Sequence, residues 1–194
     1  YVGDIAQFEK EFEEDLAVIR FAVKEFGLPS NLKLSVHSGS DKFSIYGPIN
    51  RAIKKFDAGL HLKTAGTTWL EEVIGLARAG GEGLAIAKEV YRKAFGRFDE
   101  LCGPYATVID INRAQLPSPD VVDTWSGPDY VSALQHDPAC PLYNSNVRQL
   151  LHVGYKVAAE MGDRYLSALK TFEGVIAEGV VENVLNRHIK KIFA

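Results

Sequence analysis

The stretch LKLSVHSGSDK, residues 32–42, indicates the fold class: hydrophobic residues alternate up to Val36, and a polar run begins at His37. Alternation that ends on a β-branched residue is typical of a short strand. Parallel α/β proteins place functional groups directly after their strands. We therefore expect a strand here that ends at the first residues of a site.

A second unit of the same kind follows. Residues 48–56 predict a helix, residues 58–63 (AGLHLK) a short strand, and residues 67–79 another helix. Upstream, hydrophobic residues recur every three or four positions over residues 4–26, which predicts an amphipathic helix. Two successive strand, polar loop and helix units predict a parallel α/β protein, either open or closed into a barrel.

The rest of the chain is expected to be mainly helical. The predicted helices cover residues 84–101, 146–161 and 163–188, and residues 106–111 (ATVIDI) are expected to be extended. Ser118 and Ser126 are candidate helix caps. No linker divides the sequence, so residues 1–194 are predicted to form a single domain.

Composition excludes several classes of protein. The chain has 194 residues, 46% of them hydrophobic and 24% charged, which is typical of a globular protein with a substantial core. A net charge of -3 with scattered basic residues argues against nucleic-acid binding. No apolar stretch approaches the roughly 20 residues that span a bilayer, and residues 1–6 lack a leader pattern, so we expect no membrane partner and a cytoplasmic location.

The polar run after the first strand carries several candidate site residues. His37 could ligate a divalent metal or act as a general base, or be a hydrogen-bonded structural histidine. Ser38 and Ser40 flank a glycine in a turn that suits an anion, although an ordinary turn explains them equally. Lys42 offers a charge to a carboxylate or phosphate, and Asp41 is an acid/base or metal candidate that could instead cap the loop.

The second strand carries His61 and Lys63, and a period of two places both side chains on one face. Burying these polar side chains against an apolar layer of helices would cost free energy. If the strand belongs to a barrel, His61 and Lys63 are therefore expected to face its lumen. His61 is then a ligand or substrate contact and Lys63 an electrophile or carboxylate partner. Thr64 extends this loop towards a helix N-terminus, while Thr67 is alternatively a cap.

The other histidines are interpreted as structural. His152 lies among hydrophobic residues of a predicted helix, which favours a core or interface position. His136 and His188 are expected at the surface.

Two long strings resemble the tagaturonate epimerase family: LSVHSGSDKFSIY (34–46) and GLHLKTAGTTWLEE (59–72). The resemblance continues through residues 104–110, 116–119 and 150–156. A fainter similarity links His37 and the following Ser-Gly-Ser to class II metal-dependent aldolases, where a strand ends in His-Gly-(Gly/Ala)-Ser and the histidine binds zinc. That similarity implies that His37 is a metal ligand, although Ser38 replaces the usual glycine.

The resemblance also implies a fold. The family consists of longer barrel proteins, whereas this chain begins with Tyr1 rather than Met and supplies two or three strands. A closed barrel needs at least ~200 residues. We therefore expect an α/β chain that is the C-terminal part of a TIM-type (β/α) barrel, with a long helical C-terminal extension. A second chain or a homo-oligomer could complete it.

The implied function is a metal-dependent epimerase that interconverts tagaturonate and fructuronate at C4 by retro-aldol and aldol steps. The expected cofactor is a divalent metal cation (Zn, Mn, Co or Ni), and the partner is a small sugar acid. The expected roles are metal ligation by His37 and His61, catalysis by Asp41 or His61, and substrate binding by Ser40, Lys42, Lys63 and Thr64. The alternatives are a catalytically silent binding or assembly fragment and a class II aldolase-like lyase.

Overall fold

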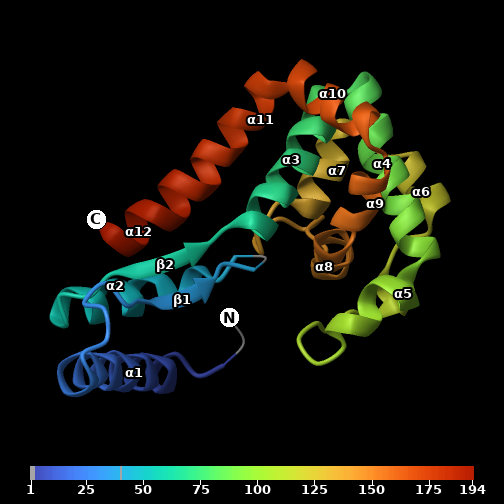
Figure 1. The fold of residues 1–194 in the computed structure, drawn as a ribbon. Coiled ribbons are helices and arrows are strands. Elements are labelled where there is room, and N and C mark those ends of the chain that lie inside the picture. The colour runs from blue at the N-terminus through green and yellow to red at the C-terminus, as the bar shows by residue number, and fades with distance from the viewer. Residues whose placement is uncertain (1–2, 40) are drawn as a thin grey trace. The chain divides into compact units, whose positions relative to one another are not determined.

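The computed structural model describes residues 3–39 and 41–194, which fall into two compact units (Figure 1). The first unit is formed by Tyr1–Thr67 with Glu182–Ala194, and the second by Thr68–Val181. Most elements of the first unit come from the N-terminal third: α1 (Ile5–Phe26), β1 (Leu34–His37), η1 (Phe43–Ile45), α2 (Tyr46–Lys55) and β2 (Leu60–Lys63). The C-terminal segment adds most of a π-helical stretch, η4 (Val181–Ile189), and α12 (Lys190–Phe193).

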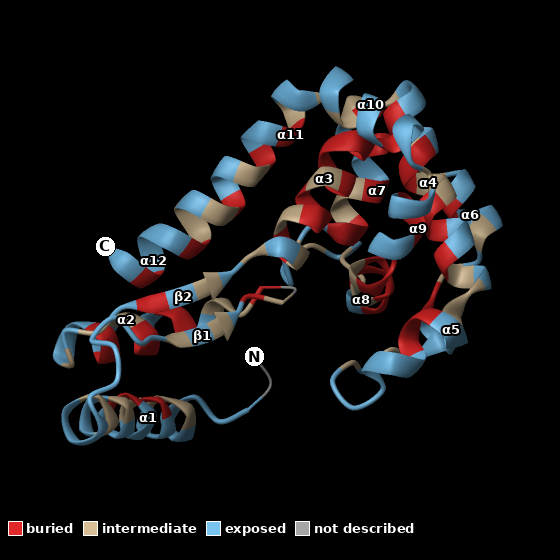
Figure 2. Cartoon of the chain, in the orientation of Figure 1, coloured by how far each residue is buried: buried red, intermediate tan, exposed pale blue. Residues whose placement is uncertain are grey.

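Helix α1 has the boundaries that its sequence predicts. The Asp4 carboxylate caps it by accepting the Gln7 N–H at 2.7 Å, and Gly27 ends it with a left-handed φ of 63°. Phe12 and Leu16 are buried on the side that faces α2 and the sheet (Figure 2). The predicted amphipathic helix is therefore confirmed.

The two strands form a parallel pair in which Leu34 is opposite Leu60 and His37 is opposite Lys63. Alternation gives this small sheet one apolar and one polar face. Its apolar face joins a core that also includes buried residues of α1, α2 and α12. The opposite face is exposed. Helices of the first unit therefore cover one face and leave the polar one open.

Helix α2 anchors both ends of the chain within the first unit. The Arg51 guanidinium donates to both carboxylate oxygens of Glu9 on α1, at 2.8 and 2.7 Å. The Arg51 side chain is exposed to solvent, so this ion pair contributes little to stability. On the other side, Ile192 of α12 is fully buried in the shared core, and the Asn50 amide donates to its carbonyl at 2.9 Å. The C-terminal helix is thus held mainly by burial.

The second unit is helical, and its core is a single cluster of buried hydrophobic residues. Its elements are α3 (Ala65–Ala79, which starts in the first unit), α4 (Gly81–Gly96), α5 (Phe98–Cys102), η2 (Gly103–Tyr105), η3 (Arg113–Gln115), α6 (Pro119–Asp123), α7 (Gly127–Leu134), α8 (Ser145–Val153), α9 (Tyr155–Glu160), α10 (Asp163–Thr171) and α11 (Glu173–Val180). The predicted caps are confirmed, because the Ser118 hydroxyl accepts the Val121 N–H and Ser126 forms a capping box with Asp129.

The expectation of a TIM-type barrel is wrong. Residues 3–39 and 41–194 contain two strands, paired in one small sheet, and the remaining elements are helical. The expected extended segment at 106–111 forms turns and irregular structure instead of a strand. The Gln149 side chain explains this outcome: its amide accepts the Asp110 N–H at 3.0 Å and donates to the Asp110 carbonyl at 2.8 Å. A neighbouring strand would have made these bonds in a sheet.

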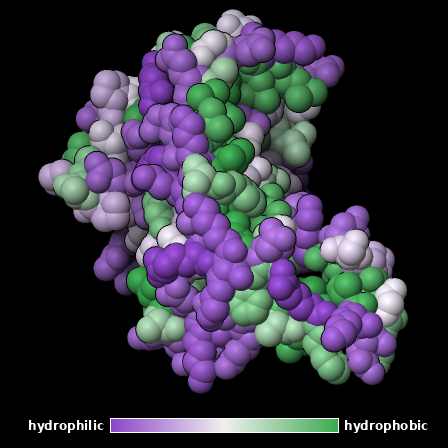
Figure 3. All heavy atoms as spheres, turned by 90° about the vertical axis from the view of Figure 1, so that its left-hand side faces the viewer, coloured by the Kyte–Doolittle hydropathy of each residue, from purple (hydrophilic) through white to green (hydrophobic). Residues whose placement is uncertain are grey.

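The surface mixes hydrophilic and hydrophobic residues, as the face drawn in Figure 3 shows. Several large hydrophobic side chains of α1 are exposed, among them Val18 (64%), Phe21 (60%) and Phe26 (69%). Among the described residues, every helix is too short or too polar to cross a bilayer.

Candidate active site

The open face of the sheet carries four polar side chains: Ser35 and His37 from β1, and His61 and Lys63 from β2. All four are exposed, and the parallel register sets Ser35 beside His61 and His37 beside Lys63. The alternation that places His61 and Lys63 on one face is thus seen in the structure. This row, which we call the polar face, is the candidate site.

The two histidines of the polar face are diagonal neighbours. With strands ~4.8 Å apart and a rise of ~3.3 Å per residue, their Cα atoms are about 8 Å apart. Imidazole nitrogens are good ligands for Zn and Ni, and side chains on one face can turn towards a common ion. No cluster of three or more His, Cys, Asp or Glu side chains occurs among the described residues. The polar face therefore fits part of a cation site, with two of about three protein ligands.

The two predicted lysines lie in different settings. Lys63 is exposed on the polar face, next to His37. Lys42 is half-buried, and its main-chain N–H donates to the Tyr46 hydroxyl at 3.1 Å. Thr64 is half-buried between β2 and the start of α3. Lys63 is consequently the lysine best placed to meet an anion on the polar face. Ser40 lies outside the described residues.

Ser38 fastens the end of β1 to the end of β2. Its N–H and its hydroxyl both approach the Lys63 carbonyl, at 3.0 and 2.9 Å. The hydroxyl also lies 2.7 Å from that of Thr67, which donates to the Gly39 carbonyl at 3.1 Å. Both residues are fully buried. Ser38 and Thr67 thus have a structural role, and Thr67 lies inside α3 instead of capping it.

Replacing Ser38 by alanine is expected to lower the free energy of unfolding by about 1–2 kcal/mol, because it removes the buried hydroxyl bonds. Urea unfolding followed by circular dichroism measures this change. Ser35→Ala is the matched control, since Ser35 is exposed on the same strand and its loss should cost less than about 0.5 kcal/mol. Equal effects of the two substitutions would show that the Ser38 bonds do not hold the loop.

Asp41 takes up a constrained position after the first strand. Its backbone has a left-handed φ of 76°, its N–H donates to the Ser38 carbonyl at 2.9 Å, and the residue is buried. Its carboxylate oxygen Oδ1 lies 3.3 Å from Nε2 of His188, and both side chains are fully buried. The acid/base role expected for Asp41 stays a prediction, and its Oδ1 atom faces His188.

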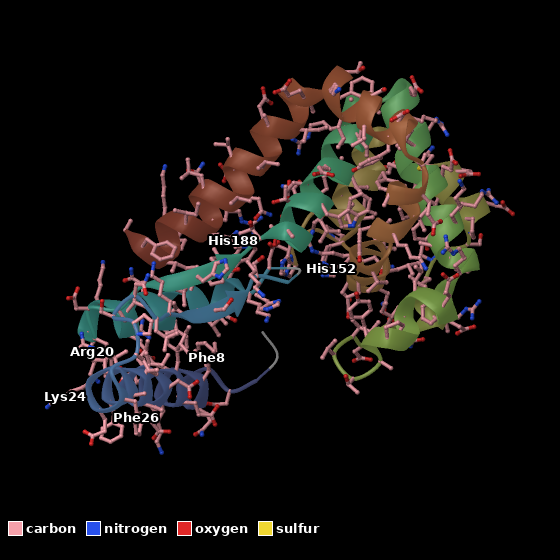
Figure 4. The ribbon with its side chains drawn as sticks, in the orientation of Figure 1. Phe8, Arg20, Lys24, Phe26, His152 and His188 are labelled. Atoms are coloured by element: carbon pink, nitrogen blue, oxygen red, sulfur yellow. The ribbon has the colours of Figure 1, made fainter. Side chains whose placement is uncertain are left out.

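His188 is a residue that sequence reasoning missed, and the expectation that it lies at the surface is wrong. It projects from η4 towards the strands (Figure 4) and is 0% exposed. Its ring packs against those of Phe43 and Tyr46, with centroids 5.4 and 5.0 Å away. The other histidine labelled in Figure 4, His152, is half-buried on α8 in the second unit. The π-helical geometry of η4 shifts the faces that a period of 3.6 predicts.

Two further side chains, Tyr46 and Arg187, bear on the charge near Asp41 and His188. Burial raises the pKa of the Tyr46 hydroxyl, which therefore stays a neutral phenol. The Arg187 guanidinium lies 4.0 Å above the Phe43 ring, an arrangement typical of a cation–π contact. Tyr46 therefore adds no negative charge beside the Asp41 carboxylate.

The two imidazoles and the ammonium group lie on two parallel strands, close to the strand ends where α/β proteins commonly place functional groups. The sequence profile of the tagaturonate epimerase family matches residues 1–193. The chain belongs to the tagaturonate epimerase family.

Individual relatives agree with this assignment. The tagaturonate/fructuronate epimerase of Thermotoga maritima is 30% identical in an alignment of 193 residues that covers 97% of this chain and 34% of the relative. The crystal structure of fructuronate-tagaturonate epimerase from Cohnella laeviribosi superposes with a TM-score of 0.71 at 27% identity, covering 99% of this chain and 35% of that one. A glycerol complex of the same enzyme gives a TM-score of 0.69 at 26% identity. The chain thus spans about a third of the length of these relatives.

Proposed function

We propose that this chain supplies part of the active site of a metal-dependent epimerase that interconverts tagaturonate and fructuronate. The polar face is the observation that carries the proposal, because it joins His37, His61 and Lys63 on one side of two neighbouring strands. Family membership supports the substrate class, since the relatives are named for these two sugar acids.

The chemistry follows from the substrates. The two acids differ at C4, whose hydrogen is β to the C2 ketone and therefore not acidic. We propose that a base takes the C4 hydroxyl proton, the C3–C4 bond breaks, and C4 becomes an aldehyde while C3 and C2 keep the electron pair. The aldehyde turns, the bond re-forms on its other face, and the proton returns to the C4 oxygen. Atoms and electrons balance without a redox cofactor.

His37 and His61 are the residues that would hold the cation. A divalent cation supplies Lewis-acid polarisation of the substrate ketone, which favours the cleavage step. An imidazole nitrogen that binds a cation cannot also take a proton, so we propose the ligand role for His61 in preference to the base role. The remaining ligand then comes from outside the described residues, in line with the greater length of the relatives.

Lys63 is the proposed partner of the substrate carboxylate. An ammonium group donates strong hydrogen bonds to a carboxylate and cannot ligate a cation while protonated. Its place beside His37 puts the two functions next to each other. We assign Lys42 and Thr64 supporting contacts on the same carboxylate, because they lie in the loops that follow β1 and β2.

A domain exchange tests the proposed function. In the exchanged enzyme, residues 1–193 of this chain replace the matching 34% of the Thermotoga maritima relative. We expect the purified, folded product to interconvert tagaturonate and fructuronate, to lose activity with a chelator and to regain it with Zn²⁺, Mn²⁺, Co²⁺ or Ni²⁺. The 194-residue chain alone is the control and should show no turnover, because it provides two of about three ligands.

Chromatographic separation of the two acids measures the conversion, and circular dichroism checks that the exchanged enzyme is folded. A folded exchanged enzyme without turnover would refute the proposal. Full turnover by the 194-residue chain as a monomer would instead show that its own residues complete the site.

A further inference from the structure

We propose that Thr67 is a positioning residue for His37, because its hydroxyl ties the turn that follows His37 to the first turn of α3. Thr67 lies in that first turn of α3, and Ser38 and Gly39 come directly after His37 at the end of β1. The part of this inference that concerns a cation rests on the proposed function, whereas the hydrogen bonds do not.

Two buried hydroxyls meet at the ends of the strands. Those of Ser38 and Thr67 lie 2.7 Å apart, and both residues are 0% exposed. Ser38 Oγ also lies 2.9 Å from the Lys63 carbonyl oxygen. Thr67 Oγ1 lies 3.1 Å from the Gly39 carbonyl oxygen. Each hydroxyl has one hydrogen to donate, so these contacts share two hydrogens between them.

One arrangement of the two hydrogens serves all of these oxygens. If Ser38 donates to Thr67, Thr67 can donate to the Gly39 carbonyl. The Lys63 carbonyl then still accepts the Ser38 N–H at 3.0 Å. If Thr67 instead donates to Ser38, the half-buried Gly39 loses a bond to its carbonyl that no other described residue supplies. Because an unmade hydrogen bond is costly, the first arrangement is favoured, and Thr67 is the donor that holds Gly39.

The turn that Thr67 holds bears on the direction of the His37 side chain. Gly39 has a left-handed φ of 58°, and glycine has wide backbone freedom, so a contact from outside the turn is needed to keep one conformation. Ser38 is bound on both sides, through its N–H to β2 and through its hydroxyl to Thr67. These bonds limit the backbone rotation that would turn His37 away from the polar face.

Replacing Thr67 by valine isolates this contribution, because valine keeps the β-branched shape and lacks the hydroxyl. The substitution removes the donor to Gly39, while both Ser38 contacts to the Lys63 carbonyl remain available. We therefore expect the pairing of β1 with β2 to survive and the turn after His37 to loosen. A purely structural role predicts instead a loss of stability without any change in the cation affinity of the folded chain.

Calorimetric titration of the chain with Zn²⁺ distinguishes the two roles. Thr67→Val should weaken binding by about 10-fold, the lower end of the range for residues that orient a metal ligand. Thr67→Ser keeps the hydroxyl and should bind Zn²⁺ like the unaltered chain. Thr68→Val is the matched control and should leave affinity unchanged, since Thr68 is half-buried on the same helix and its hydroxyl bonds to no described residue.

Amide hydrogen exchange tests the turn without any cation. The Asp41 N–H donates to the Ser38 carbonyl at 2.9 Å within the turn. In Thr67→Val this amide should exchange about 10-fold faster, whereas the amide of Ala52, buried inside α2, should change much less. Equal acceleration of both amides would show a general loss of stability and overturn the proposal.

The outcomes separate the two proposals. If the unaltered chain binds no Zn²⁺, the proposed cation site fails, and the exchange rates still decide whether Thr67 holds the turn. If the chain binds Zn²⁺ and Thr67→Val matches Thr68→Val in affinity, the positioning role is refuted. If Thr67→Val does not fold, Thr67→Ala takes its place beside Thr68→Ala, and equal affinities of that pair would refute the role in the same way.

Discussion

Replacing His37 by alanine in the exchanged enzyme is expected to lower kcat/KM by more than about 100-fold. Loss of a residue that only supports a metal ligand costs 10–100-fold, so loss of a ligand should cost more. The fold should survive, because the His37 side chain is exposed and such substitutions change the free energy of unfolding by about 0.5 kcal/mol or less. Steady-state kinetics and metal analysis of the purified protein measure both effects.

His136→Ala is the matched control for that substitution. It removes one half-buried imidazole from the second unit and leaves the polar face intact. Metal content that stays the same in His37→Ala and in the control would contradict the ligand assignment, whatever happens to turnover.

Replacing Lys63 by methionine is expected to raise KM for tagaturonate by about 10–100-fold. A hydrogen bond between charged partners contributes roughly 1.5–3 kcal/mol, and methionine keeps the length of the side chain without its charge. The KM for the corresponding neutral ketose should hardly change, because that ketose has no carboxylate for Lys63 to bind. Kinetics on both substrates give the comparison.

Two further lysine variants test whether the effect on KM is specific to Lys63. Lys10→Met changes an exposed lysine of α1 and should alter neither KM. Lys42→Met tests the half-buried lysine of the loop, for which we expect a smaller effect than for Lys63. If Lys63→Met raises both KM values equally, the ammonium group does not recognise the carboxylate.

The polar face could be predicted from the sequence because it depends on local patterns. A period of two over Leu60–Lys63 is enough to place His61 and Lys63 together, and the structure has them so. The helices that bracket the strands follow from their own periodicity. Local patterns do not determine which residues of the two strands lie opposite each other. The parallel register, which sets His37 beside Lys63, is known only from the structure.

Two predictions, for residues 106–111 and for His188, were wrong because they relied on local patterns where long-range contacts determine the structure. The segment at 106–111 alternates like a strand, but its main chain bonds to Gln149, which lies 39 positions away from Asp110. His188 was expected at the surface but is buried, and it lies in a π-helical segment where a period of 3.6 does not assign the faces. Its partner Asp41 lies 147 positions earlier in the numbering, and no local pattern links the two. Long-range contacts thus decided both cases.

The central claim is that His37 and His61 bind one divalent cation together, and a calorimetric titration of this chain with Zn²⁺ tests it most directly. Four proteins are compared: the unaltered chain, His37→Ala, His61→Ala and the double variant. If both imidazoles hold one ion, each single substitution should weaken binding more than about 10-fold, and the double variant should lose little more than either single one. Affinity that is unchanged in both single variants, or that falls by independent steps that multiply in the double variant, would contradict the shared site.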